Sequence, residues 1–214
     1  MLVAMFAIGA LASASASAAL PEFKSGYKFP IPFTAKSNSV TLNIKGGGAY
    51  LCKTSTTTGE ITGPKEVAKV IIKFNGENGC SGFCKQPVHE GWWETKELKG
   101  RIGYLNKGFR TVGLLLEGTV EPFAKCNTPL FGGPEKLIGA IIGELSPTNT
   151  GTTSFALTYK QGVERGQQQI THFEGEEALH NLETIKSPGA AGIKTSVELQ
   201  EDKVTTAKEV QIVA

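Results

Sequence analysis

The sequence predicts an all-β protein: an antiparallel β-barrel or β-sandwich with many short strands and little helix. Glycine is frequent, with 26 residues in a chain of 214. Segments rich in Val, Ile and Thr lie between the glycine-containing turns and alternate apolar with polar residues, as half-buried strands do. Turn signals recur about every 8–12 residues, which is the spacing of strands in sandwiches and barrels.

The clearest strand is SVTLNIKG, residues 39–46. Val40, Leu42 and Ile44 share one face, and polar residues occupy the other, because successive side chains of a strand point to opposite sides. Similar patterns predict strands at 67–74, 110–118, 153–159, 195–200 and 209–213.

The segment KFPIPFTAK, residues 28–36, also alternates but contains Pro30 and Pro32. Proline has no N–H to donate to a β-ladder. We therefore expect this segment to be an edge strand or the chain's entry to one.

Two segments are ambiguous between helix and strand. EEALHNLETI, residues 176–185, has the pattern of about two turns of helix. GPEKLIGAII, residues 133–142, contains Gly139 and is followed by Gly143. Glycine costs about 1 kcal/mol relative to alanine inside a helix, so we predict a strand there.

A short internal similarity links LKGRIGYL, residues 98–105, to LIGAIIGEL, residues 137–145. Each segment has glycines at matching places inside a predicted strand. Glycines in strands mark bulges, bends or a close approach of another chain segment. This pattern is typical of a sheet that coils into a barrel.

The first residues, MLVAMFAIGALASASASAAL, predict a secretory signal peptide over residues 1–19. An apolar stretch is followed by alternating Ala and Ser, and small side chains precede a cut before Leu20. The stretch is too short to span a bilayer as a helix. We expect residues 20–214 to form a single all-β domain, secreted or associated with the cell wall, with no membrane span in the mature chain.

The charge balance argues against a nucleic-acid partner. The formal net charge is +2, and the chain has no basic stripe of the kind that polyanion-binding proteins carry.

Cys52, Cys80, Cys84 and Cys126 form an even set in a chain predicted to be exported, so disulfides are expected. Cys80 and Cys84 enclose only Ser-Gly-Phe and can bond across a tight turn. Cys52 and Cys126 end predicted strands and would form the second bridge. Structural zinc sites use two closely spaced pairs of ligands, whereas this chain has one, so zinc is disfavoured. The connectivity stays open at this point.

The segment GCSGFCKQPVHEGWWETK, residues 79–96, contains both tryptophans. Trp92 and Trp93 are adjacent on a predicted strand and therefore face opposite sides. An exposed indole beside His89 and Glu94 can stack on a sugar ring while the polar groups bind its hydroxyls. The alternative is a structural role, because large aromatic side chains contribute strongly to cores.

The segment THFEGEEALHNLE, residues 171–183, is the densest group of polar side chains able to do chemistry. His172, His180 and a carboxylate such as Glu174 resemble a metal triad in composition. Their spacing matches no known zinc pattern, however, and a solvated loop is the preferred interpretation. The chain also lacks the sequence contexts of serine nucleophiles and phosphate-binding loops. We assign no catalytic residue, metal or cofactor.

One group of motifs indicates a relationship. The segments TGPKEVA, LKGRIGYL and FEGE, within CKTSTTTGEITGPKEVAKVIIKFNGENGC, ETKELKGRIGYLNK and TSFALTYKQGVERGQQQITHFEGE, resemble a group of exported proteins of soil actinobacteria. The similarity covers nearly all of the chain after the signal peptide. It implies a secreted, β-rich, disulfide-containing protein and transfers no functional residue.

Together these observations favour a non-enzymatic secreted or cell-surface β domain. Its expected partner is an extracellular glycan or a surface protein, or its role is structural, as in a coat protein. The alternative is a secreted hydrolase that acts on polysaccharide through a carboxylate pair drawn from Glu90, Glu94 and Glu174.

Overall fold

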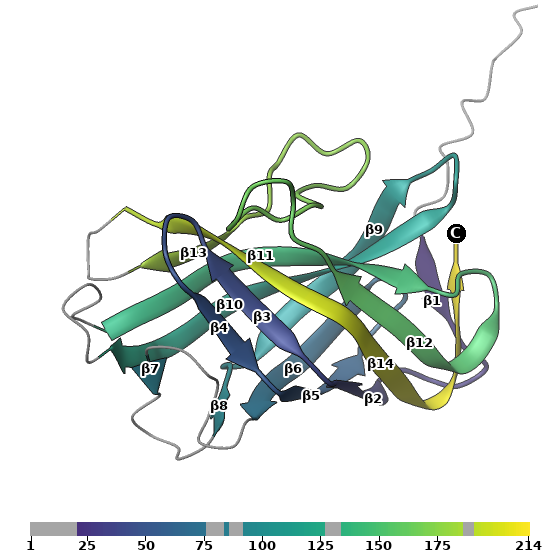
Figure 1. Cartoon of the computed structure of the whole chain (residues 1–214). Coiled ribbons are helices and arrows are strands. Elements are labelled where there is room, and N and C mark those ends of the chain that lie inside the picture. Colours follow the sequence, from purple (N-terminus) through teal and green to yellow (C-terminus); the bar gives the residue numbers. More distant parts are fainter. Residues whose placement is uncertain (1–20, 76–83, 86–91, 127–133, 186–190) are drawn as a thin grey trace, which may run out of the picture.

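A computed structural model describes residues 21–75, 84–85, 92–126, 134–185 and 191–214 of the chain. These residues form a single antiparallel β-sheet that closes into a barrel, with further strands outside it (Figure 1). The strands are β1 (Glu22–Lys24), β2 (Ile31–Ser37), β3 (Val40–Ile44), β4 (Ala49–Cys52), β5 (Thr54–Ile61), β6 (Glu66–Asn75), β7 (Cys84–Lys85), β8 (Trp92–Glu94), β9 (Leu98–Asn106), β10 (Thr111–Cys126), β11 (Pro134–Ser146), β12 (Gly151–Tyr159), β13 (Leu182–Ile185) and β14 (Ile193–Val213).

Eight strands make the barrel in the order β12-β11-β10-β9-β6-β5-β2-β14, and β14 pairs with β12 to close it. The remaining strands extend this sheet: β3 and β4 continue from β14, and β13 pairs with both β11 and β14. The predicted all-β class is confirmed, in its barrel form.

The long strand β14 closes the barrel and runs diagonally across Figure 1. Residues 195–199 pair with β3, whereas residues 203–206 pair with β2. The predicted strands at 195–200 and 209–213 are therefore two parts of one strand.

The alternation predicted for residues 28–36 is confirmed, whereas in 40–44 Asn43 of the polar face is buried as well. Ile31, Phe33 and Ala35 of β2 are buried and the residues between them are exposed. The predicted edge position of this segment is wrong, however, because β2 lies between β5 and β14. Pairing with β14 begins only at Phe33. Pro30 precedes the strand, and Pro32 lies in its first part, which pairs only with β5. The missing N–H groups of both prolines therefore interrupt no ladder with β14.

The expected strand at 133–142 is confirmed as the first part of β11, whereas the helical pattern at 176–185 is wrong. Residues 182–185 form β13, in which Leu182 and Thr184 are buried, and residues 176–181 lie outside regular elements. Pairing of β13 with two strands outweighs a weak helical preference. The described residues form no helix long and apolar enough to cross a lipid bilayer.

The barrel wall is buried on both faces where the segment between β12 and β13 covers it. Leu114 and Leu116 of β10 face the interior, whereas Leu115 packs in an outer cluster with Phe173 of that segment. Phe173 lies against Gly103 so closely that a Cβ atom there would be 2.5 Å from its ring. The close backbone approach expected for the glycines of 98–105 is found at Gly100, where a Cβ atom would overlap the carbonyl oxygen of Leu115.

Candidate functional site

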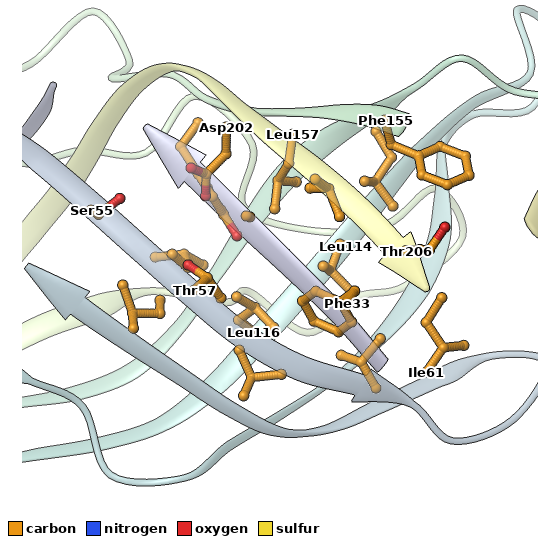
Figure 2. A pocket seen from close by; sticks show the side chains of 18 of the residues that line it. Phe33, Ser55, Thr57, Ile61, Leu114, Leu116, Phe155, Leu157, Asp202 and Thr206 are labelled. Atoms are coloured by element: carbon orange, nitrogen blue, oxygen red, sulfur yellow. The ribbon is translucent and has the colours of Figure 1, made fainter. Parts of the chain in front are cut away.

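The interior of the barrel contains two neighbouring cavities, of about 80 and about 60 Å³. Val40, Phe74 and Ile141 line both. Figure 2 shows the larger cavity, with side chains such as Phe33 and Leu116 around it. A buried water needs about 10–15 Å³, so each cavity has room for more than a single water. Eight-stranded barrels are just wide enough to be filled by side chains or to hold one small ligand.

Within the described part of the chain, three polar atoms in the wall of the larger cavity have no hydrogen-bond partner: Ser55 Oγ, Tyr159 Oη and Asp202 Oδ1. The three residues are only 2%, 4% and 4% exposed. Buried polar atoms are nearly always paired with protein or water, and leaving one unpaired costs about 1–3 kcal/mol. These atoms are therefore the strongest candidates for groups that bind a molecule inside the barrel.

Three strands bring the unpartnered atoms to the cavity. Ser55 comes from β5, Tyr159 ends β12, and Asp202 lies in β14 directly opposite Leu157 of β12. Gly143 of β11 makes room for the Tyr159 ring, because a Cβ atom there would lie 2.8 Å from it. Figure 2 shows Ser55 and Asp202 toward the same side of the cavity.

The electrostatics of the cavity are dominated by one carboxyl group. Burial raises the pKa of Asp202 from 3.8 to about 6, because its charged form loses hydration. The group is therefore still mostly ionised at neutral pH. Burial also raises the pKa of Tyr159, and the nearby Asp202 carboxylate acts in the same direction. The site thus presents a carboxylate and neutral hydroxyl groups in an apolar wall.

The predicted glycan patch falls only partly within the described residues. His89 lies outside them. Trp92, Trp93 and Glu94 form β8, whose backbone pairs with residues 73–75 of β6. Glu94 is half-buried, and the side chains of the two tryptophans lie outside the described part. The patch stays a prediction.

The strand register places two cysteines opposite each other that the sequence did not suggest as partners. Cys52 is buried on β4. Cys84 of β7 lies directly opposite Cys126 of β10 in the pairing of the two strands. Cys80 and the side chains of Cys84 and Cys126 are outside the described residues, so the predicted connectivity is not tested.

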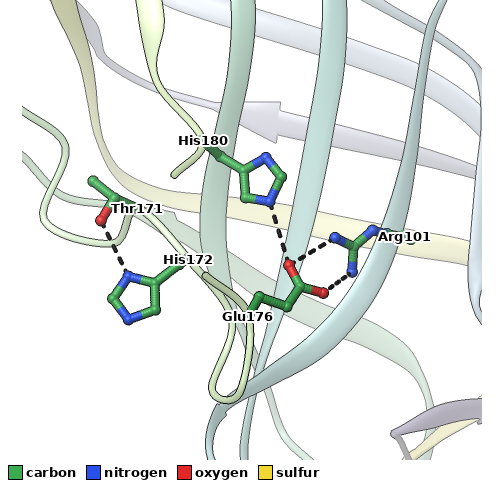
Figure 3. Close-up of polar contacts among 5 residues, drawn as sticks. All are labelled: Arg101, Thr171, His172, Glu176 and His180. Atoms are coloured by element: carbon green, nitrogen blue, oxygen red, sulfur yellow. Dashed lines mark hydrogen bonds and ion pairs between the residues drawn. The ribbon is translucent and has the colours of Figure 1, made fainter. Parts of the chain in front are cut away.

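The His- and Glu-rich segment contains an ion-pair clamp on the outside of the barrel (Figure 3). Glu176 Oε1 and Oε2 accept hydrogen bonds from Arg101 Nη1 and Nη2 at 2.8 and 2.9 Å. His180 Nε2 lies 3.4 Å from Glu176 Oε2. The hydrogen bonds from Arg101 lower the pKa of Glu176 against the opposing effect of burial, and His180 adds to the lowering. The clamp holds the segment between β12 and β13 against β9.

The side chains of His172 and Glu174 in that segment are not part of the clamp. His172 is exposed and its Nδ1 lies 3.3 Å from Thr171 Oγ1 (Figure 3). The Glu174 carboxylate accepts a hydrogen bond from the backbone N–H of Lys107. In the part of the chain that the structure describes, no group of three or more His, Cys, Asp or Glu residues could hold a metal ion.

Of the carboxylates suggested for a hydrolase, the two that the structure describes, Glu94 and Glu174, do not lie together. Glu90 lies outside the described residues. Glu94 belongs to β8, and Glu174 lies in the segment between β12 and β13, on a different side of the barrel in Figure 1. Neither lines the interior cavities.

The unpartnered interior atoms were missed by the sequence analysis. Ser55 belongs to TSTTTGEI, a polar stretch with no apolar alternation, and Asp202 follows the acidic Glu201. A usable signal was nevertheless present. Ser55 and Thr57 lie an even number of residues before buried Ile61, so the three side chains point to the same face of β5. Asp202 likewise lies two residues before buried Val204 on β14 and shares its face.

Comparison with known proteins identifies no family for the chain. No protein-family model, curated protein or solved structure matches the chain.

Proposed function

We propose that this protein is a secreted, non-enzymatic β-barrel that binds a small, mainly apolar molecule in its interior. One observation carries the proposal: Ser55 Oγ, Tyr159 Oη and Asp202 Oδ1 are buried around an apolar cavity and have no hydrogen-bond partner among the residues that the structure describes. Small-molecule sites combine an apolar wall with a few polar groups that orient the ligand. A barrel used only as a structural unit would gain stability from apolar side chains at these three positions.

The cavity size limits the ligand. An apolar cavity of about 150 Å³ admits benzene. Neither of the two neighbouring cavities, of about 80 and about 60 Å³, reaches that volume alone, but together they come close to it. A short aliphatic chain therefore suits the larger cavity, whereas a single aromatic ring would extend across the shared wall of Val40, Phe74 and Ile141 into the smaller one. A long lipid would require the interior side chains to move apart.

Filling the larger cavity should abolish binding. Ala35 lines it from β2 and is buried, so Ala35→Leu places a branched side chain in the space that a ligand would use. We expect para-fluorotoluene and para-fluorobenzyl alcohol to bind the wild-type protein, and the variant to bind each at least about tenfold more weakly, a loss of about 1.4 kcal/mol. Fluorine NMR titration of the purified protein measures both dissociation constants.

The matched control is Thr34→Leu, which adds an apolar side chain to the exposed outer face of the same strand. It should bind both probes like wild type. Overpacking costs about 1–3 kcal/mol, so circular dichroism must show that Ala35→Leu stays folded. Failure of both probes to bind wild-type protein would contradict the proposed function.

Export and disulfide formation are part of the same proposal, supported by the signal-peptide features and by the resemblance to exported proteins. Residues directly opposite on antiparallel strands are about 4.5–5.5 Å apart at Cα, within disulfide range. The register thus favours a Cys84–Cys126 bridge and leaves Cys52 to pair with Cys80. This differs from the pairing expected from the sequence, Cys80–Cys84 with Cys52–Cys126.

Mass spectrometry of protein collected from the growth medium tests both points. We expect a chain that lacks residues 1–19 and contains no thiol that reacts with iodoacetamide before reduction. Non-reducing peptide mapping should link Cys84 to Cys126. A peptide in which Cys80 is joined to Cys84 would instead support the pairing across the tight turn.

A further inference from the structure

The charge inside the barrel indicates what kind of head group a ligand carries. Among the described residues that line the two cavities, none is Lys, Arg or His, and the charged ones are Asp202 and Glu117. Glu117 is paired with Lys99 at 3.2 Å, and its side chain is partly exposed. Asp202 is therefore the carboxylate whose charge acts on the larger cavity.

The nearest cationic residues along the strands around Asp202 do not share its face. Lys203 follows Asp202 on β14 and is exposed, and its cross-strand partner Lys36 on β2 is exposed as well. Across β12, Asp202 is opposite Leu157, and the titratable side chain next to it in the cavity wall is Tyr159. Asp202 Oδ1 accepts no hydrogen bond from any of these groups.

We infer that the ligand is a small primary amine with an apolar body, and that its ammonium group binds the Asp202 carboxylate inside the larger cavity. This inference rests on the proposed function and names the ligand class of the same site. A buried carboxylate is strongly disfavoured unless a cation and hydrogen bonds compensate its lost hydration. The ligand supplies the cation that the described cavity wall lacks.

The three unpartnered atoms suit an ammonium group better than the alternatives. A protonated primary amine has three N–H donors and no acceptor. Ser55 Oγ, Tyr159 Oη and Asp202 Oδ1 can each accept a hydrogen bond. A carboxylate or phosphate ligand would instead be repelled by Asp202. A neutral alcohol can pair with the same atoms but leaves the charge of Asp202 uncompensated.

The apolar wall of the larger cavity indicates the chemistry of the part of the ligand that carries the amine. Phe33, Leu114 and Leu157 belong to the wall of the larger cavity, and Leu157 lies beside Asp202 in Figure 2. A phenyl or short alkyl group attached to the amine would contact these side chains. Hydrogen bonds to charged groups are about twice as strong as neutral ones, so the charge should dominate the choice among ligands of equal size.

Four probes with the same ring test the inference: para-fluorobenzylamine, para-fluorobenzyl alcohol, para-fluorotoluene and para-fluorobenzoate. Dissociation constants are measured by fluorine NMR at about pH 7.5, where an alkylamine is protonated. We expect the amine to bind wild-type protein about tenfold more tightly than the alcohol, and the benzoate not to bind. In Asp202→Asn the advantage of the amine over the alcohol should disappear while the alcohol and toluene probes still bind.

The outcomes separate the inference from the proposed function. If the alcohol and toluene probes bind wild type but the amine binds no better, the ligand class is wrong and the proposed function stands. If the amine is preferred equally by wild type and Asp202→Asn, it binds elsewhere and the inference is overturned. If no probe binds, the proposed function itself fails. Asp202→Asn keeps the size of the side chain, and Glu198→Gln on the exposed face of β14 controls for loss of a negative charge.

Discussion

Asp202→Asn is expected to raise the free energy of unfolding of the ligand-free protein by about 2–3 kcal/mol at neutral pH, and to change it little below about pH 3.8. The reason is the burial of a carboxylate that has an unpartnered oxygen in the cavity wall. The pKa of Asp202 is raised from 3.8 to about 6, and each pKa unit corresponds to about 1.4 kcal/mol. The amide is neutral at every pH and avoids this cost.

The direction of the pH dependence follows from the raised pKa. Between about pH 4 and pH 6 the unfolded chain has released the Asp202 proton while the folded protein still holds it. Folding therefore takes up a proton in this window, and the contribution of Asp202 to stability falls as the pH rises. Above about pH 6 the full penalty of the buried charge is present.

Urea unfolding at a series of pH values measures this difference. Wild type should lose stability relative to Asp202→Asn as the pH rises from about 4 to about 6, and the two curves should run parallel above that range. Glu198→Gln, an exposed acid on the same strand, should follow wild type throughout. A difference between Asp202→Asn and wild type that does not vary with pH would mean that the Asp202 carboxyl is solvated in the folded protein.

Gly139→Ala is expected to be the most damaging small substitution in the barrel, with a loss of about 3–5 kcal/mol. Gly139 has a φ of +114°, which an L-residue with a side chain rarely adopts. A Cβ atom would also overlap the carbonyl oxygen of Asn181. That oxygen cannot easily move, because it accepts a hydrogen bond from the N–H of Ala140 at 3.0 Å.

Thermal and urea denaturation of Gly139→Ala test this expectation. The matched control is Gly63→Ala, in the turn between β5 and β6, where a Cβ atom would meet nothing within 4 Å. The control should stay within about 0.5 kcal/mol of wild type. Equal stabilities of the two variants would show that the backbone near Asn181 can move away without loss of stability. The close contact between Gly139 and Asn181 would then not be needed for the fold.

The class of the fold and the inward face of several strands follow from local sequence patterns. Alternation along 31–37 and along 40–44 is a local property with a period of two residues, so it can be recognised without knowing the neighbouring strands. The strand at 153–159 has the same pattern, and its buried Phe155, Leu157 and Tyr159 face the barrel interior. The signal peptide and the tryptophan patch stay predictions, because residues 1–20, His89 and the side chains of both tryptophans lie outside the described part.

The closure of the strands into a barrel and the contents of its interior depend on contacts between distant parts of the chain. β2 is not an edge and 182–185 is not a helix, because pairing partners far along the chain, β14 and β11, fix both. Similarly, a polar residue such as Ser55 or Asp202 looks solvent-exposed until the barrel closes around it. Whether eight inward faces fill their interior or leave a cavity depends on the summed volumes of all their side chains, and no single segment carries that information.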